Sequence, residues 1–233
     1  QLPCSFCAAR VCNYRKEERG KRLKEISAPY PTSFPQPLFM TYQPFNIGSR
    51  FRIAPQDSNH SADRIDLVMQ RGAFGSGEHQ TTSSCLELME SMAELDAARI
   101  LDLGSGTGIL AIAALKLGAK DAVCVDIEAR AVETARTNCA LNRLEDRVTH
   151  ITGTLDEVSE AGFDVILANI YGDILVSIAD SLSKKLRQGG TLLLSGILWE
   201  YNFDVRQAYQ SQGCEVIKNR ILDEFSTVLM KKL

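Results

Sequence analysis

From residue 98 onward, short apolar segments alternate with segments whose apolar residues recur at helical spacing. Continuous apolar strands joined by helices imply a parallel sheet that is covered on both faces. The strand-like segments are 98–104, 121–127, 147–152, 163–170 and 191–197, and the helix-like segments are 108–118, 129–142, 173–186 and 200–213.

The end of the chain departs from this alternation. Two strand-like segments, 214–222 and 225–232, are separated by only Asp223 and Glu224, which is the spacing of a hairpin. The sequence therefore predicts an α/β fold of the Rossmann-like kind. Its sheet has seven strands, mostly parallel with the last one antiparallel, and helices lie on both faces.

The first 40 residues differ from the rest. They combine three cysteines, a charged run and prolines 29, 31, 35 and 37, which exclude a regular helix or central strand there. We expect an N-terminal extension over residues 1–40 and one domain over residues 41–233. Within that domain, segments 45–55 and 64–72 have the alternation of short strands around a polar loop.

Composition limits the partners. A net charge of −3 gives no basic field for nucleic acid, and no apolar run is long enough to span a membrane. Four of the seven cysteines lie in apolar surroundings typical of reduced core positions, which favours a cytoplasmic protein. These cysteines are Cys85, Cys124, Cys139 and Cys214.

The segment ILDLGSGTG, residues 100–108, lies where a strand meets a helix. Missing side chains at such a turn let backbone N–H groups approach a ligand. A phosphate-binding P-loop requires a lysine after its last glycine, and no lysine follows Gly108. A dinucleotide fingerprint requires a third glycine at position 109, where this chain has Ile109. The glycines at 104, 106 and 108, with Asp102 two residues earlier, resemble motif one of the S-adenosylmethionine methyltransferases.

Two carboxylates accompany this turn. Asp102 can hold the amides of the turn and face a cationic methionine moiety, whereas it would repel a pyrophosphate. Asp126 ends the next strand, 22 residues after Gly104, a separation suited to binding ribose hydroxyls. The second acid fits NAD and S-adenosylmethionine equally. In the purely structural alternatives, the glycines form a tight turn and Asp126 caps the helix after it.

An earlier glycine-rich stretch, GAFGSGEHQTT, covers residues 72–82. Glu78 and His79 stand where a P-loop has Lys and Ser or Thr, and a glutamate there repels phosphate. The stretch resembles the A-F-G-T-G-x-H-x-T-T signature of the PrmA family, bacterial methyltransferases that modify amino groups of a large-subunit ribosomal protein. The resemblance covers residues 42–233 and continues through LDLGSGTGILAIAALKLGA, VDIEARAVETARTN, FDVILANI and LLLSGIL.

The resemblance implies that the first glycine loop folds over a cofactor held by the second. The resemblance makes S-adenosyl-L-methionine the expected cofactor. It implies cofactor contacts from Thr82, Gly104, Asp126 and Asn169. Asp102 and Gly106 are expected to bind the cofactor too, because they lie in the same glycine motif as Gly104. From the residues alone, Thr82 is equally suited to capping a helix, and His79 to a structural hydrogen bond. Ser84 and Glu87 have capping-box spacing.

Asn169 closes the strand 163–170 and is followed by Ile170, Tyr171 and Gly172. The N-P-P-Y/F sequence of amide and adenine methyltransferases is missing. The PrmA pattern is close to N-I-L-A-G-P-L, so the chain departs from it at residues 171–174. We expect Asn169 and Tyr171 to face the methyl acceptor, and no residue is assigned as a catalytic base.

The sequence thus predicts a PrmA-like methyltransferase that acts on an amino group, a lysine above all, of a protein, with a ribosomal protein as the candidate acceptor. Two alternatives stay open: a small-molecule methyltransferase, and a non-catalytic partner protein that binds the adenosine cofactor. PrmA proteins carry a folded N-terminal domain that residues 1–40 do not match. Cys4, Cys7 and Cys12 lie there without the fourth ligand of structural zinc, so no metal is assigned.

Overall fold

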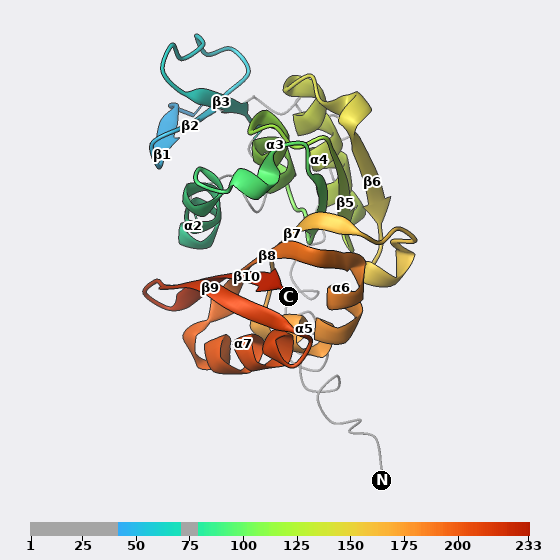
Figure 1. Ribbon diagram of the computed structural model, residues 1–233. Helices are drawn as coiled ribbons and strands as arrows, with labels where there is room; N and C mark the ends of the chain where they lie inside the picture. The colour runs from blue at the N-terminus through green and yellow to red at the C-terminus, as the bar shows by residue number, and fades with distance from the viewer. Residues whose placement is uncertain (1–41, 71–78) are drawn as a thin grey trace, which may run out of the picture. The chain divides into compact units, whose positions relative to one another are not determined.

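The larger of two sheets has seven strands in the order β6-β5-β4-β7-β8-β10-β9 (Figure 1). The computed structural model describes residues 42–70 and 79–233, all in one compact unit. β10 pairs antiparallel with β8 and β9, and the other pairs are parallel, which confirms the predicted sheet. The strands are β4 (Arg99–Leu103), β5 (Asp121–Asp126), β6 (Val148–Thr152), β7 (Phe163–Asn169), β8 (Leu186–Leu198), β9 (Cys214–Ile221) and β10 (Phe225–Lys232).

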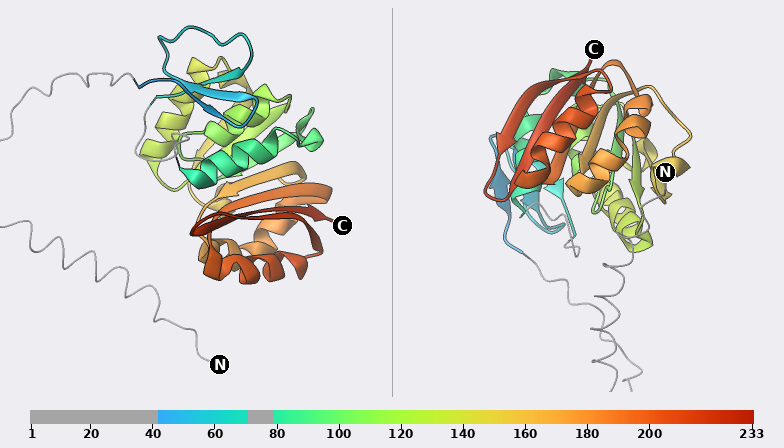
Figure 2. Two further views of the ribbon diagram at one scale, coloured as in Figure 1. Left: turned by 90° about the vertical axis from the view of Figure 1, so that its left-hand side faces the viewer. Right: turned by 90° about the horizontal axis from the view of Figure 1, so that it is seen from below.

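Helices cover both faces of this sheet, as predicted (Figure 2). One face packs against α2 (Gln80–Met89), α3 (Ile109–Lys116) and α4 (Ala129–Leu141), and the other against α5 (Gly172–Ser177), α6 (Ala179–Lys185) and α7 (Asn202–Gln210). Because side chains alternate along a strand, neighbours such as Ile100 and Leu101 enter different cores. All four cysteines expected in the core are buried and free.

A second, three-stranded sheet precedes the large one. It contains β1 (Phe45–Ile47), β2 (Phe51–Ala54) and β3 (Ile65–Val68), with β1 antiparallel and β3 parallel to β2. The segment 45–55 forms two strands rather than one, because Gly48 takes a φ of +58° and turns the chain. The sheet joins the same core as α2 and α3.

Two predicted helix details are wrong. The segment 173–186 forms α5 and α6, with Ile178 between them, instead of one helix. The capping box at Ser84 and Glu87 is absent, because α2 begins at Gln80. The Glu87 carboxylate instead accepts a 2.6 Å hydrogen bond from Arg220 of β9.

The strand order places a switch point between β4 and β7. From β4 the chain continues outward through β5 and β6, whereas β7 returns to the other side of β4 and leads to β8. Loops leave the carboxyl ends of β4 and β7 in opposite directions, and open α/β sheets bind ligands in the crevice between such loops. The two predicted site segments, Gly104–Gly108 and Asn169–Gly172, follow these two strands.

Candidate cofactor and acceptor site

The turn after β4 is held against two neighbouring strands. The N–H groups of Gly104 and Ser105 both donate to Val125 O, at 2.8 and 3.0 Å. Gly104, with a φ of +70°, also packs closely on the loop after β7, since an added Cβ would lie 2.3 Å from Ile170 Cγ2. A side chain at this position would therefore push the two loops apart.

Asp126 fastens this turn from the end of β5. Its Oδ2 accepts from the Gly106 N–H at 2.8 Å, and its Oδ1 accepts from the Glu128 N–H at 2.9 Å, next to the start of α4. Asp126 therefore has a structural role in holding the turn, although it does not cap α4, whose N-cap residue is Glu128. Each carboxylate oxygen retains a second lone pair, so these hydrogen bonds leave room for two hydroxyl donors.

Asp102 lies deeper than the sequence suggested. Its side chain is 1% exposed, and its Oδ2 accepts from the Ala111 N–H at 3.1 Å, in the first turn of α3 rather than in the glycine turn. Burial raises the pKa of this carboxyl to about 7, and the nearby charge of Asp126 acts in the same direction. The site therefore contains a buried acid that changes protonation near neutral pH.

The two segments of the predicted signature meet at Thr82 and Asn169. Asn169 Nδ2, at the end of β7, donates to Thr82 Oγ1 in the first turn of α2 at 3.3 Å. Thr82 is buried and does not cap the helix. His79 does, because its Nδ1 accepts from the Thr81 N–H, which agrees with the structural role expected for this histidine.

The amide oxygen of Asn169 faces a glycine that sequence reasoning missed. Gly196 of β8 has a φ of +75°, and an added Cβ would lie 3.1 Å from Asn169 Oδ1 and 2.7 Å from Ile170 O. The Ile170 N–H also donates to Ser195 O at 3.1 Å. Gly196 belongs to the segment LLLSGIL of the family resemblance, and because it has no side chain, no Cβ of this residue contacts the amide oxygen.

Asn138 of α4 is a second residue that sequence reasoning missed. Its side chain is fully buried, its Nδ2 donates to Thr107 O at 2.9 Å, and its Oδ1 accepts from the Gln70 N–H at 2.8 Å. One amide therefore links the glycine turn to the residue that leads into segment 71–78. That segment, with most of the first glycine stretch, lies outside the described residues.

The structure brings most of the predicted site residues to one edge of the sheet. Gly104, Gly106, Asp126 and Asn169 lie at or next to the carboxyl ends of β4, β5 and β7, with Thr82 against Asn169. Tyr171 follows Asn169 by two residues at the start of α5, and its side chain is 68% exposed. Ile127, 74% exposed beside Asp126, is an apolar neighbour that the sequence analysis did not assign.

Two kinds of feature are absent from the part of the chain that the structure describes. Residues 42–70 and 79–233 contain no group of three or more His, Cys, Asp or Glu side chains that could hold a metal ion. Cys4, Cys7 and Cys12 lie outside these residues. Among the described helices, none has both the length and the apolar composition needed to cross a membrane.

Known proteins resemble this chain over most of its length. A relative from Pelobacter propionicus, named ribosomal protein L11 methyltransferase, is 39% identical over 94% of this chain and 77% of its own length. One of the same name from Trichlorobacter lovleyi is 42% identical over 72% of this chain and 57% of its own length. The chain thus spans between about half and three quarters of these two relatives.

A solved structure of a protein with the same described function is also similar to this chain. The crystal structure of ribosomal protein L11 methylase from Lactobacillus delbrueckii subsp. bulgaricus superposes with a TM-score of 0.73 at 28% identity, covering 82% of this chain and 99% of that one. The profile of the family described as ribosomal protein L11 methyltransferase matches residues 36–233. The predicted family, methyltransferase class and fold are confirmed: the chain belongs to the PrmA family of ribosomal protein L11 methyltransferases.

Proposed function

We propose that this chain transfers a methyl group from S-adenosyl-L-methionine to an amino group, a lysine amine above all, of a ribosomal protein. The observation that carries the proposal is the hydrogen bond between Asn169 and Thr82. It joins the two signature segments at the switch point, beside Gly104. Family membership supports the reaction class, and the acceptor is the finer part of the proposal.

The residues at this edge fit the cofactor. Asp126 has lone pairs left for ribose hydroxyls, and the exposed Ile127 beside it offers an apolar contact for an adenine ring. No described atom lies within 4 Å of a Cβ added at Gly106, so the backbone of the turn is open to a ligand. Above about pH 7, where it is ionised, the Asp102 carboxylate supplies negative charge behind the turn, which suits a sulfonium.

The cofactor would supply an electrophilic methyl group, so the acceptor must present a neutral amine with its lone pair aligned. A lysine amine has an ordinary pKa of about 10.4, and desolvation favours its uncharged form. Asn169 suits the alignment, since its Nδ2 donates to Thr82 while its Oδ1 lies beside Gly196, which has no side chain to contact it. That oxygen can accept a hydrogen bond from the amine, whose departing proton passes to water.

We also propose the cellular and domain context. A ribosomal-protein acceptor implies reaction in the cytoplasm, which agrees with the four reduced cysteines. Residues 41–233 would carry the methyltransferase domain and residues 1–40 an extension. The family profile begins at residue 36, near this boundary.

The test uses methyl-labelled S-adenosylmethionine with purified proteins of a bacterial large ribosomal subunit and, separately, with a cell extract. We expect one labelled protein band whose acid hydrolysate contains a methylated amino group. Label found only in small metabolites would instead identify a small-molecule methyltransferase. Cofactor binding by calorimetry with no labelled product from either source would identify a non-catalytic binding protein.

A further inference from the structure

Three loops on the acceptor side of the sheet edge are tied into one surface. They follow β7, β8 and β9 and contain residues 170–174, 199–204 and 222–224. Gly172 packs on Tyr201, since an added Cβ would lie 2.7 Å from Tyr201 Cβ. The Trp199 N–H donates to Glu224 O at 2.9 Å, which joins the second loop to the third.

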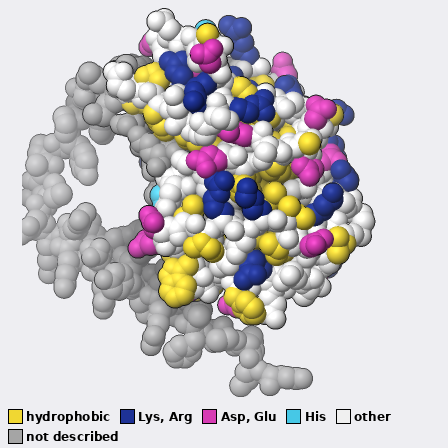
Figure 3. Space-filling view, turned by 60° about the vertical axis from the view of Figure 1, so that its left-hand side comes forward, with side chains coloured by type: hydrophobic (Ala, Val, Ile, Leu, Met, Phe, Trp, Pro, Cys, Tyr) yellow, Lys and Arg dark blue, Asp and Glu magenta, His cyan; other side chains and the backbone are white. Residues whose placement is uncertain are grey.

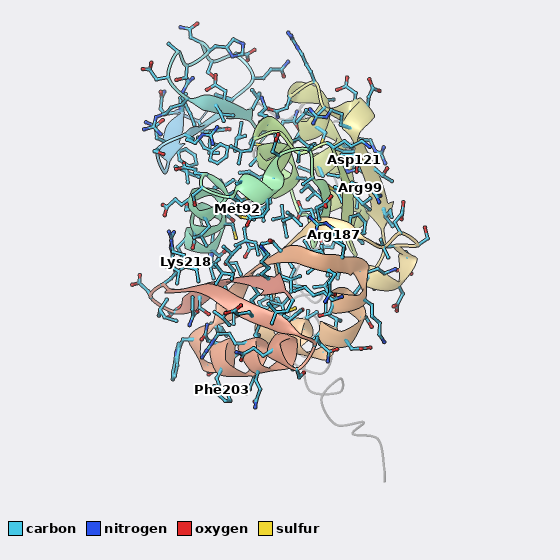
Figure 4. All side chains as sticks on the ribbon, viewed as in Figure 1. Met92, Arg99, Asp121, Arg187, Phe203 and Lys218 are labelled. Carbon is cyan, nitrogen blue, oxygen red and sulfur yellow. The ribbon has the colours of Figure 1, made fainter. Side chains whose placement is uncertain are left out.

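Large apolar side chains project from these loops into solvent. The exposed fractions are 68% for Tyr171, 66% for Trp199 and 61% for Phe203. Figure 4 shows Phe203 on the outer side of α7, pointing away from the sheet. In Figure 3, hydrophobic side chains gather in the lower part of the visible face, with acidic side chains at its left margin and some Lys or Arg side chains between them. Exposed aromatic side chains in such number mark a contact surface.

The charges on the same loops are mostly negative and unpaired. Five exposed acids lie there, and none forms an ion pair with another described residue. The loops themselves carry no Lys or Arg; among the cations of the adjacent elements, Arg220 pairs with Glu87, whereas Arg206 donates only to the neutral Asn202 Oδ1. We call this region the acidic aromatic surface, made of Tyr171, Asp173, Ile174, Trp199, Glu200, Phe203, Asp204, Asp223 and Glu224.

We infer that the acidic aromatic surface binds a basic segment, rich in lysine and arginine, of the methyl-accepting protein. Carboxylates attract such a segment, and Trp and Tyr faces bind ammonium and guanidinium groups. The surface begins at Tyr171, two residues beyond Asn169, so a segment held there lies next to the proposed transfer site. The inference rests on the proposed function for the identity of the occupant. A nucleic acid does not fit, because its phosphates would meet the five carboxylates.

The test measures peptide binding to the full chain without cofactor. The probe is a fluorescently labelled ten-residue peptide of lysine, arginine and glycine, and a glutamate and glycine peptide of equal length is the comparison. We expect fluorescence anisotropy to show binding of the basic peptide alone, with an affinity that falls as salt rises. The double variant Glu200→Lys with Asp204→Lys should weaken this binding at least about tenfold.

A matched double variant controls for net charge. Glu94 and Asp146 are exposed acids that precede β4 and β6, so they lie at the opposite edge of the sheet. Glu94→Lys with Asp146→Lys changes the net charge equally and should leave peptide affinity within about threefold. Equal weakening in both double variants would overturn the inference, because it would show attraction by net charge alone.

Trp199 provides a second readout, since it is the only tryptophan of the chain. Its fluorescence emission in the wild-type chain should change as the basic peptide binds. The Trp199→Leu variant should bind the labelled peptide about threefold more weakly. Unchanged emission together with unchanged affinity in Trp199→Leu would contradict the assigned surface.

The outcomes separate this inference from the proposed function. Absence of peptide binding, or equal binding of the acidic peptide or of a single-stranded RNA oligonucleotide, overturns the inference even where ribosomal proteins become labelled. Specific binding of the basic peptide without any methyl transfer supports the surface and counts against the proposed function.

Discussion

The two halves of the candidate site are built in different ways. The cofactor half, formed by the loops after β4 and β5, is fixed by backbone groups and by side chains that bond to them, such as Asp126 on the Gly106 N–H. The acceptor half, formed by the loops after β7 and β8, presents exposed side chains such as Tyr171 and Trp199. Asn169 and Gly196 are held closely in that half, by the hydrogen bond to Thr82 and by packing against Ile170.

The cofactor half is also the part of the candidate site that carries most of the PrmA-like motifs of this sequence. A cofactor of constant shape needs an approachable backbone, so the glycines and the acids around them follow the family motifs. An acceptor surface is read by side chains, and there the chain departs from the PrmA pattern at residues 171–174. We therefore expect cofactor-half variants to change binding or stability and acceptor-half variants to change transfer.

The largest effect is expected in the acceptor half, for Asn169→Ala. Loss of the amide should lower the rate of methyl transfer to ribosomal proteins by about 100-fold, since a group that aligns the amine is removed. Cofactor affinity measured by calorimetry should change less than about fivefold. Asn46→Ala, at an exposed position of β1, is the control and should have neither effect.

Gly196→Ala should have the next effect. The added Cβ would contact Ile170 O and cover Asn169 Oδ1, so we expect the transfer rate to fall by about 30-fold. Gly213→Ala is a matched control, because Gly213 also has a positive φ of +80° but an added Cβ meets nothing within 4 Å. Equal loss of activity in both variants would reduce the role of Gly196 to backbone strain.

Asp102→Asn tests the buried acid of the cofactor half. The pKa of Asp102 is about 7 in the fold against an ordinary 3.8, so the folded chain holds a proton that the unfolded chain lacks between these values. The free energy of unfolding should therefore fall as pH rises from about 4 to about 7 and level off above. Asparagine is uncharged at every pH, and its Oδ1 can still accept from the Ala111 N–H.

At pH 8 we expect Asp102→Asn to be more stable than wild type by a few kcal/mol, on the order of the free energy that corresponds to the raised pKa, with little gain at pH 4. Thermal unfolding at both pH values measures this. The same variant should bind S-adenosylmethionine more weakly, because the negative charge behind the turn is lost. A stability difference that is equal at pH 4 and pH 8 would show that Asp102 titrates normally.

Asp126→Ala should give the smallest of these effects, and we expect it to change cofactor affinity alone. Lost ribose hydrogen bonds should weaken cofactor affinity at least about tenfold, or about 1.4 kcal/mol. Calorimetry with S-adenosylhomocysteine measures the change. Asp146→Ala is the control, because Asp146 is exposed and lies at the opposite edge of the sheet. Unchanged affinity would restrict Asp126 to holding Gly106 and Glu128.

Sequence reasoning succeeded where the signal is local. The strands from Arg99 to Lys232 and most helices follow apolar periodicity, and the seven-stranded sheet follows from their order. The break between α5 and α6 was missed, since nothing near Ile178 punctuates the helical pattern. The helix start at His79 was missed because it depends on where a ring nitrogen lies, not on the spacing of capping residues.

The site was predicted less completely because its supports are long-range. Thr82 and Asn169 were placed together only through the family resemblance, as 87 residues separate them. Asn138 bonds to groups 31 and 68 residues away, and Gly196 matters only because Ile170 lies against it. No local pattern marks such residues, since their roles exist only once the chain has folded.

A structure of the full chain with S-adenosylhomocysteine would show whether the loops after β4, β5 and β7 hold the cofactor. The account predicts the ribose hydroxyls within about 3 Å of the Asp126 carboxylate, with the sulfur end of the molecule beside Gly104 and Asn169. An adenosine bound away from the carboxyl ends of β4 and β5, or a chain that takes up none of the compound, would contradict it.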